Sequence, residues 1–282
     1  MDKLEVNLCY CLTLTACLGF GTWQTTFAVV GNTNTTAVFE AKFGWDKDEA
    51  IFYNAIISSA SVVGLTIGSF VGGAIVQKGR RRTIIIGQAI AIFASLVSMV
   101  THAATLTIGR LILGIGAGIM NVVFGKYVSE TIPQHMVSRF TSSLNFSVCF
   151  GFIACFALGY LLPDADDFEA NKKDELWRAI WLGPTFVGII EILLILTMFR
   201  NEPIAFCLTE GRDDEALKGL SYVYRKKNPD DTESIEEILE NHYELLKKST
   251  TLDASTTSFK QAACGPKYWK ATWVCFMINF FN

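Results

Sequence analysis

The chain of 282 residues is 51% apolar and only 18% charged, with a formal net charge of -3. Soluble domains carry about 25% charged residues, and here the charges fall in short blocks between long uncharged runs, which excludes an ordinary soluble fold. A membrane-spanning helix needs about 20 mostly apolar residues, and several runs reach that length. The sequence therefore predicts an all-α, polytopic membrane protein surrounded by a lipid bilayer.

The residue types that build catalytic and metal sites show no organised spacing. Three histidines and eight cysteines are scattered along the chain, without the paired spacing of a zinc site. Neither a catalytic constellation nor a nucleotide-binding loop is present. We therefore expect no enzyme activity, no metal, no cofactor and no nucleic-acid partner.

Taken in chain order, the sequence predicts a bundle of spanning helices followed by a charged insert. The six spans lie at about 6–30, 51–76, 83–104, 105–128, 140–162 and 177–199, with a polar loop at 31–50. Residues 1–200 thus form a transmembrane bundle, and the strongly charged residues 201–270 form a helical insert outside the membrane. One insert helix starts near Asp213, and another starts at the capping-box sequence from Ser234. Residues 271–282 begin a seventh span.

Basic residues set the orientation, because lysine and arginine mark the cytoplasmic side. They follow the second, fourth and sixth spans, as Lys78, Arg80, Arg81, Arg82, Arg139 and Arg200. The N-terminus and the insert are therefore predicted to be cytoplasmic. The sequon Asn34-Thr35-Thr36 then falls outside, in the predicted loop, which makes Asn34 a glycosylation candidate.

Two ionisable residues lie inside predicted spans, where a charge is costly and is by default a functional hypothesis. Arg110 lies near the start of the fourth span and Glu191 lies near the middle of the sixth. Each residue also has a purely structural explanation: Arg110 could extend its side chain to the membrane interface, and Glu191 could pair with a cation. In the first span, Trp23 and Gln24 belong to a polar stripe that either packs against another helix or lines a cavity.

Five motifs in order resemble the N-terminal half of the major facilitator superfamily, and within it the sugar porter family. Each resembles one of that family's signatures: Gly72 with Gly79-Arg80-Arg81, Ile108-Gly109-Arg110, Tyr127 to Glu130 with Pro133 and Arg139, Trp177-Arg178, and Glu202 to Arg212. The resemblance covers essentially the whole chain. It implies a six-helix half-bundle, a partner half of six more helices, and alternating access between the two.

The resemblance also implies a cytoplasmic latch of ion pairs, made here by Gly72, Gly79, Arg80, Arg81, Glu130 and Arg139. Val76 stands where the family has an acid. The surviving pair that we expect joins Glu130 to Arg80 or Arg81.

For the substrate site, the family places a glutamine six residues before a helix 5 glycine, and Asn145 stands six before Gly151. Asn145 is thus the leading sugar ligand, with Trp23 and Gln24 as further candidates; alternatively, Asn145 bonds a neighbouring helix. Proton-coupled relatives carry an aspartate in helix 1, whereas this chain has Gly21-Thr22-Trp23 there. The resemblance therefore favours facilitated diffusion of a hexose, in the plasma membrane or else an organelle membrane. The alternative function is a transport-inactive half-transporter that acts as a membrane subunit or sensor.

Overall fold

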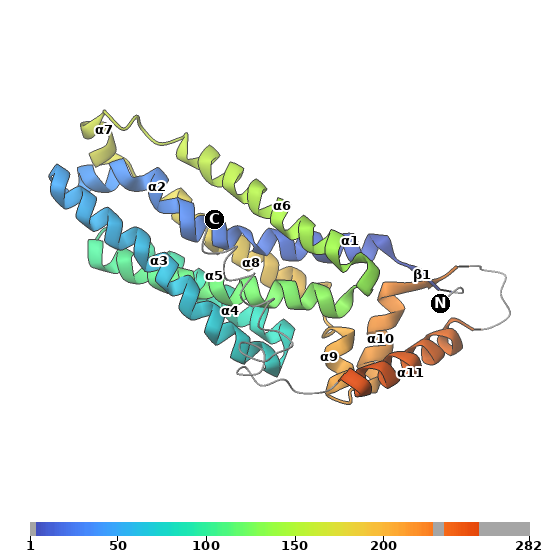
Figure 1. The fold of residues 1–282 in the computed structure, drawn as a ribbon. Coiled ribbons are helices and arrows are strands. Elements are labelled where there is room, and N and C mark those ends of the chain that lie inside the picture. The colour runs from blue at the N-terminus through green and yellow to red at the C-terminus, as the bar shows by residue number, and fades with distance from the viewer. Residues whose placement is uncertain (1–3, 228–233, 254–282) are drawn as a thin grey trace.

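The computed structural model describes residues 4–227 and 234–253. Long helices run side by side along one axis, and a group of short helices covers one end of them, which we call the insert end (Figure 1). The long elements are α1 (Leu8–Gly21), α2 (Trp23–Phe43), α3 (Lys47–Ile75), α4 (Arg80–Ser98), α5 (Ala103–Thr131), α6 (Gln134–Gly159) and α8 (Trp177–Thr197). The short elements are η1 (Val76–Lys78), α7 (Phe168–Lys173), α9 (Ile204–Thr209), α10 (Asp213–Val223) and the strands β1 (Leu4–Val6) and β2 (Tyr224–Lys226). The insert also contains one longer helix, α11 (Ile235–Asp253).

Within the described ranges, five helices are long and apolar enough to cross a membrane. They are Lys47–Lys78, Arg80–Ser98, Ala103–Thr131, Gln134–Gly159 and Trp177–Thr197, matching the second to sixth predicted spans. Large apolar side chains remain exposed along them, among them Phe70, Phe146, Phe150 and Phe186. Such a surface suits lipid contact and not water.

The first predicted span differs from the structure. It is broken at Thr22 into α1 and α2, and α2 continues to Phe43, so the loop predicted at 31–50 is largely helical. The polar residues of α2 find partners inside the bundle: Asn32 Nδ2 donates to Ser58 Oγ at 3.0 Å. Gly44, with φ of 66°, ends the helix, and Asp46 caps the next one. Polar composition predicted a loop because these partners lie on other helices.

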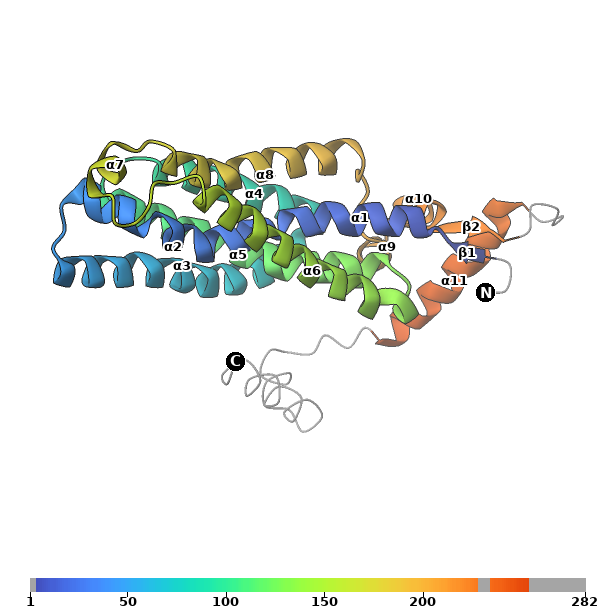
Figure 2. The same cartoon turned by 90° about the horizontal axis from the view of Figure 1, so that it is seen from above.

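The glycines of the second span form a close-packing face. α3 and α5 lie side by side over their length, as Figure 2 shows from above. A Cβ atom added to Gly64 would lie 2.1 Å from the carbonyl oxygen of Leu111, and one added to Gly68 would lie 2.1 Å from that of Ile115. Only glycine permits this approach of the two backbones.

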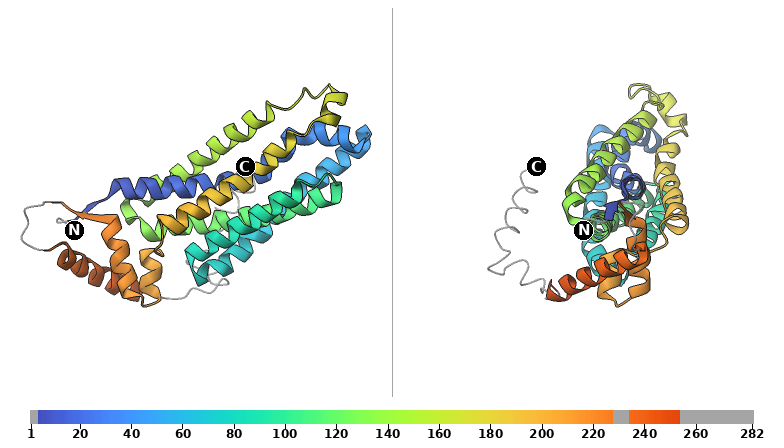
Figure 3. Two further views of the ribbon diagram at one scale, coloured as in Figure 1. Left: turned by 180° about the vertical axis from the view of Figure 1, so that it is seen from behind. Right: turned by 90° about the vertical axis from the view of Figure 1, so that its right-hand side faces the viewer.

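The insert packs on the bundle through a shared core. One hydrophobic cluster joins Leu14 of α1 and Phe124 of α5 to Leu220 and Leu239 of the insert. β1 pairs antiparallel with β2, so the N-terminal segment lies against the insert (Figure 3). The predicted cap at Ser234 is present, because its Oγ accepts from the Glu237 backbone at 3.2 Å. The predicted seventh span at 271–282 lies outside the described residues.

Candidate functional site

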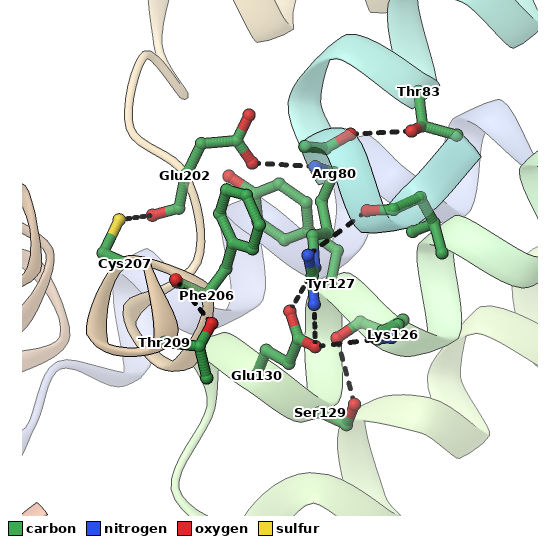
Figure 4. Close-up of polar contacts among 12 residues, drawn as sticks. Arg80, Thr83, Lys126, Tyr127, Ser129, Glu130, Glu202, Phe206, Cys207 and Thr209 are labelled. Carbon is green, nitrogen blue, oxygen red and sulfur yellow. Dashed lines mark hydrogen bonds and ion pairs between the residues drawn. The ribbon is translucent and has the colours of Figure 1, made fainter. Parts of the chain in front are cut away.

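A bidentate ion pair joins the start of α4 to the end of α5 at the insert end. Arg80 Nε donates to Glu130 Oε2 at 2.6 Å, and Arg80 Nη2 donates to Oε1 at 2.7 Å. The third guanidinium nitrogen donates to the backbone oxygen of Val76 at 3.2 Å. The guanidinium also lies 4.1 Å from the ring centroid of Phe206 (Figure 4). Of the two cations proposed for Glu130, the geometry selects Arg80.

Glu202 closes the same cluster from the segment after α8. Its Oε2 accepts from the backbone nitrogens of Arg80 at 2.9 Å and Arg81 at 3.1 Å, where a helix N-terminus favours negative charge. Gly79 precedes this turn with φ of 136°, which favours glycine. The Tyr127 hydroxyl donates to Asn201 O at 2.9 Å. The segment after α8 is therefore held to α4 and α5 together.

The other proposed latch residues take different places. Gly72 is pressed against α5, since an added Cβ would lie 2.9 Å from Ile119 Cα. The Arg81 side chain has a buried Nε without a partner. Arg139 is exposed on α6 and makes no ion pair with the residues that the structure describes. The family has an acidic side chain at the position of Val76. Here the backbone carbonyl of Val76 accepts a hydrogen bond from Arg80 instead.

Glu191 is fully buried inside the bundle, in a network of neutral amides. It accepts a hydrogen bond from Gln88 Nε2, and Gln88 Oε1 accepts from Gln24 Nε2 at 2.8 Å. Gly21 makes room for it, because an added Cβ would lie 2.0 Å from Glu191 Oε2. Among the described residues Glu191 has no cationic partner, so the alternative that it pairs with a cation has no support there. Gln24 is also fully buried, so its side chain packs inside the bundle and does not line an open surface.

Arg110 is fully buried as well, so the alternative that it snorkels to the interface is wrong. Its Nε donates to Ile57 O at 3.1 Å and its Nη2 to Ser61 Oγ at 3.0 Å. The guanidinium lies 5.4 Å from the ring centroid of Trp181. Over the described ranges it makes no salt bridge with a carboxylate, and neutral backbone, hydroxyl and aromatic groups stabilise its charge instead.

A second group of polar side chains lies where α2 meets α5 and α6. The half-buried Trp23 donates from Nε1 to Ser147 Oγ at 3.2 Å. Thr25 Oγ1 donates to the exposed Asn121 at 2.9 Å. Asn145 is exposed on α6, and its side chain makes no hydrogen bond to a described residue. No sequence motif marks Asn121 as a ligand, and its exposure and its hydrogen bond with Thr25 are what add it to this group.

The glycosylation candidate Asn34 lies in helix α2 and not in a loop. Its Nδ2 donates to Cys155 O at 2.8 Å, which engages the nitrogen that a glycan would occupy. The predicted loop position is therefore wrong. Glycosylation stays a prediction that requires this bond to open.

Comparison with known proteins places these features in a family. A family model described as "Sugar (and other) transporter" matches residues 10–282. The chain belongs to this sugar transporter family. It is a multi-pass membrane protein.

Curated relatives and solved structures agree with this assignment. Hexose transporter 1 of Plasmodium falciparum (isolate 3D7) is 27% identical over 254 residues, covering 85% of this chain and 50% of that protein. Plastidic glucose transporter 4 of Arabidopsis thaliana is 31% identical over 187 residues, covering 64% of this chain and 32% of that protein. The chain spans about half the length of the Plasmodium relatives it matches.

Solved structures show the same fold. The proton:xylose symporter XylE bound to 6-bromo-6-deoxy-D-glucose has a TM-score of 0.76 at 16% identity, covering 90% of this chain and 56% of that one. The partially occluded, inward-open form of XylE from E. coli has a TM-score of 0.72 at 16% identity, covering 88% and 60%. The all-α half-bundle of the major facilitator superfamily is thus the fold of this chain.

Proposed function

We propose that this chain supplies the N-terminal half of a transporter that moves a hexose across a membrane by alternating access. The Arg80–Glu130 pair carries the proposal, because it assembles the family's cytoplasmic motifs around one buried contact. Relatives described as hexose and glucose transporters support the substrate class. A second half of six helices is the required partner, since substrate binds between two halves in such folds.

The polar face of α2, α5 and α6 fits this substrate class. A sugar donates and accepts through neutral hydroxyls, so its site needs amides, hydroxyls and aromatic faces. Trp23, Thr25, Asn121 and Asn145 supply these groups and carry no charge. Asn145 remains the leading ligand because its amide is exposed, whereas Gln24 is enclosed.

The latch acts at the cytoplasmic side, which is where the basic residues place the N-terminus and the insert. The Arg80–Glu130 pair and the Glu202 cap fix the α3–α4 turn against the segment after α8. Arg81 and Arg139, which lack an ion pair within the described ranges, are then the side chains left to meet the partner half. The division into residues 1–200, 201–270 and 271–282 and the plasma-membrane location are parts of this proposal.

Transport is proposed to be passive. Trp23 stands where proton-coupled relatives carry an aspartate, and Glu191 bonds to Gln88 and not to Arg110. Glu191→Gln should therefore leave the pH dependence of uptake unchanged. Loss of a pH-dependent component in this variant would contradict passive transport.

The direct experiment measures radiolabelled glucose uptake by the complete gene product in cells without their own hexose transporters. Asn145→Ala should raise the apparent KM about tenfold, which corresponds to about 1.4 kcal/mol of lost sugar binding. Ser142→Ala is the matched control, because Ser142 is exposed on the same helix and donates to Ser138 O. Equal effects of the two variants would remove Asn145 from the site, and absence of hexose uptake would contradict the proposed function.

A further inference from the structure

A cavity of about 730 Å³ lies at the insert end, between the α5–α6 turn and the insert. Pockets for drug-sized ligands span about 300–1,000 Å³, so this one has the volume of a ligand site. Its walls come from β1, the α5–α6 turn, α9, α10, β2 and α11, which meet at the same end of the molecule (Figure 1). Most of the surface is apolar, and includes Leu4, Val6, Ile132, Ile204, Leu208 and Leu246.

The described residues around the cavity favour an uncharged ligand. Among the described residues that line it there is no lysine or arginine, so these residues offer no strong counter-ion for a phosphate or carboxylate. Glu130, the one carboxylate among the described lining residues, is already bonded to Arg80 on both oxygens. An unpaired charge buried against apolar walls is costly. The cavity therefore suits an uncharged molecule.

His242 of α11 supplies a polar anchor in this wall. The residue is 6% exposed, and its Nε2 has no hydrogen-bond partner among the described residues. Its ring lies edge-on to Tyr224, with centroids 5.1 Å apart, and both rings line the cavity. Burial lowers the pKa of His242, which favours the neutral imidazole. A buried polar atom without a hydrogen-bond partner is uncommon in proteins, and a polar group of a ligand would supply the missing partner.

We propose that this cavity binds an uncharged, mostly apolar small molecule that carries a hydroxyl or carbonyl group for His242. Such a ligand would contact the insert and the α5–α6 turn at once, next to the Arg80–Glu130 pair. Its binding would hold the insert against the bundle. An effect on transport rests on the proposed function, whereas the binding itself does not.

The test uses the photoreactive alcohol 4-(hydroxymethyl)benzophenone on the purified complete protein in detergent. After irradiation, labelled peptides are identified by mass spectrometry, with unreactive diphenylmethanol as competitor. Labelling should concentrate on α9 and α11 and fall with competitor. His242→Phe keeps an aromatic ring beside Tyr224 and should lower labelling about fivefold, the effect of one hydrogen bond. His102→Phe, exposed before α5 and remote from the cavity lining, is the matched control and should not change it.

A second variant fills the cavity instead of removing its polar group. Ala205 lines the cavity from α9, so Ala205→Trp should abolish labelling while the protein keeps its thermal transition. If that variant fails to fold, Leu208→Phe replaces it. Labelling spread over the membrane helices, or labelling that neither His242→Phe nor the filling variant lowers, would overturn the proposal. Because no transport is measured, failure here leaves the proposed function standing.

Discussion

Arg80 at the start of α4 holds both carboxylate oxygens of Glu130 at the end of α5, with nitrogen–oxygen distances of 2.6 and 2.7 Å. The pair forms although Val76 stands where the family has an acid, because the third arginine nitrogen bonds to the Val76 backbone. Phe206 stacks over the guanidinium. A charged pair enclosed in this way depends on both partners.

Removing Glu130 alone should therefore be costly, because the charge of Arg80 stays buried without its partner. Glu130→Ala leaves a buried guanidinium and should lower the free energy of unfolding by about 3 kcal/mol. A double-mutant cycle with Arg80→Ala should give a coupling of about 2 kcal/mol, measured by chemical denaturation in micelles. Lys126, 4.0 Å from Glu130 and exposed, is the control and should couple by less than about 0.5 kcal/mol. Equal couplings would show that Arg80 is an ordinary surface partner.

Glu202 should contribute to stability as the cap of α4. Glu202→Ala removes the acceptor of two backbone N–H groups and should cost about 1 kcal/mol, seen as a lower Tm. Glu202→Gln keeps an acceptor and should lose less. Glu210→Ala, on the exposed end of the same segment, should leave Tm unchanged. The capping role is wrong if Glu202→Ala matches Glu210→Ala.

Gly21 should be intolerant of a methyl group because Glu191 occupies that space. Gly21→Ala should lower the free energy of unfolding by about 1–3 kcal/mol, the usual cost of overpacking. Adding Glu191→Ala should recover part of the loss. Gly125→Ala is the matched control, since its Cβ would meet nothing within 4 Å. No recovery in the double variant would mean that Glu191 does not fill the space beside Gly21.

Sequence alone predicted the uniformly apolar spans and the ion pair between Arg80 and Glu130, whose residues belong to recognisable motifs. It missed the helical course of α2 to Phe43, because Asn32 and Asn34 look like loop residues until their partners on α3 and α6 are known. Arg110 and Glu191 were recognised as intramembrane charges. Their burial depends on Ser61 and Gln88, which lie 49 and 103 residues away, and no local pattern carries that information.

The role of Glu202 as a helix cap could not be predicted from the residues around it either. It was named only as the start of a motif, yet its carboxylate caps a helix 122 residues earlier in the chain. In contrast, the choice of Asn145 as a ligand rests on spacing to Gly151, and its exposure on α6 agrees with that choice without testing it. The sequence does not show which distant residues become hydrogen-bond partners, either for the helix cap by Glu202 or for the buried polar network of Glu191.

His242 should make the insert sensitive to acid. Burial lowers the pKa of His242 in the folded protein below its ordinary value of about 6.5. The unfolded chain then takes up the proton first, so stability is full above about pH 6.5 and falls as the pH drops toward the folded pKa. Thermal unfolding from pH 8 to 5 should show this loss in the native chain and a smaller loss in His242→Phe. His135→Phe, at an exposed site, should retain the full loss. The same curve for His242→Phe and the native chain would contradict the assignment.

We propose that this chain forms half of a passive hexose transporter, and glucose counterflow is the decisive measurement. The complete gene product is reconstituted in liposomes loaded with unlabelled glucose, and entry of labelled glucose is followed with no pH gradient. Passive transport should give a transient, saturable overshoot that Glu130→Ala reduces and a proton ionophore leaves unchanged. Absence of an overshoot with any hexose, or an overshoot that appears only with an imposed proton gradient, would contradict it.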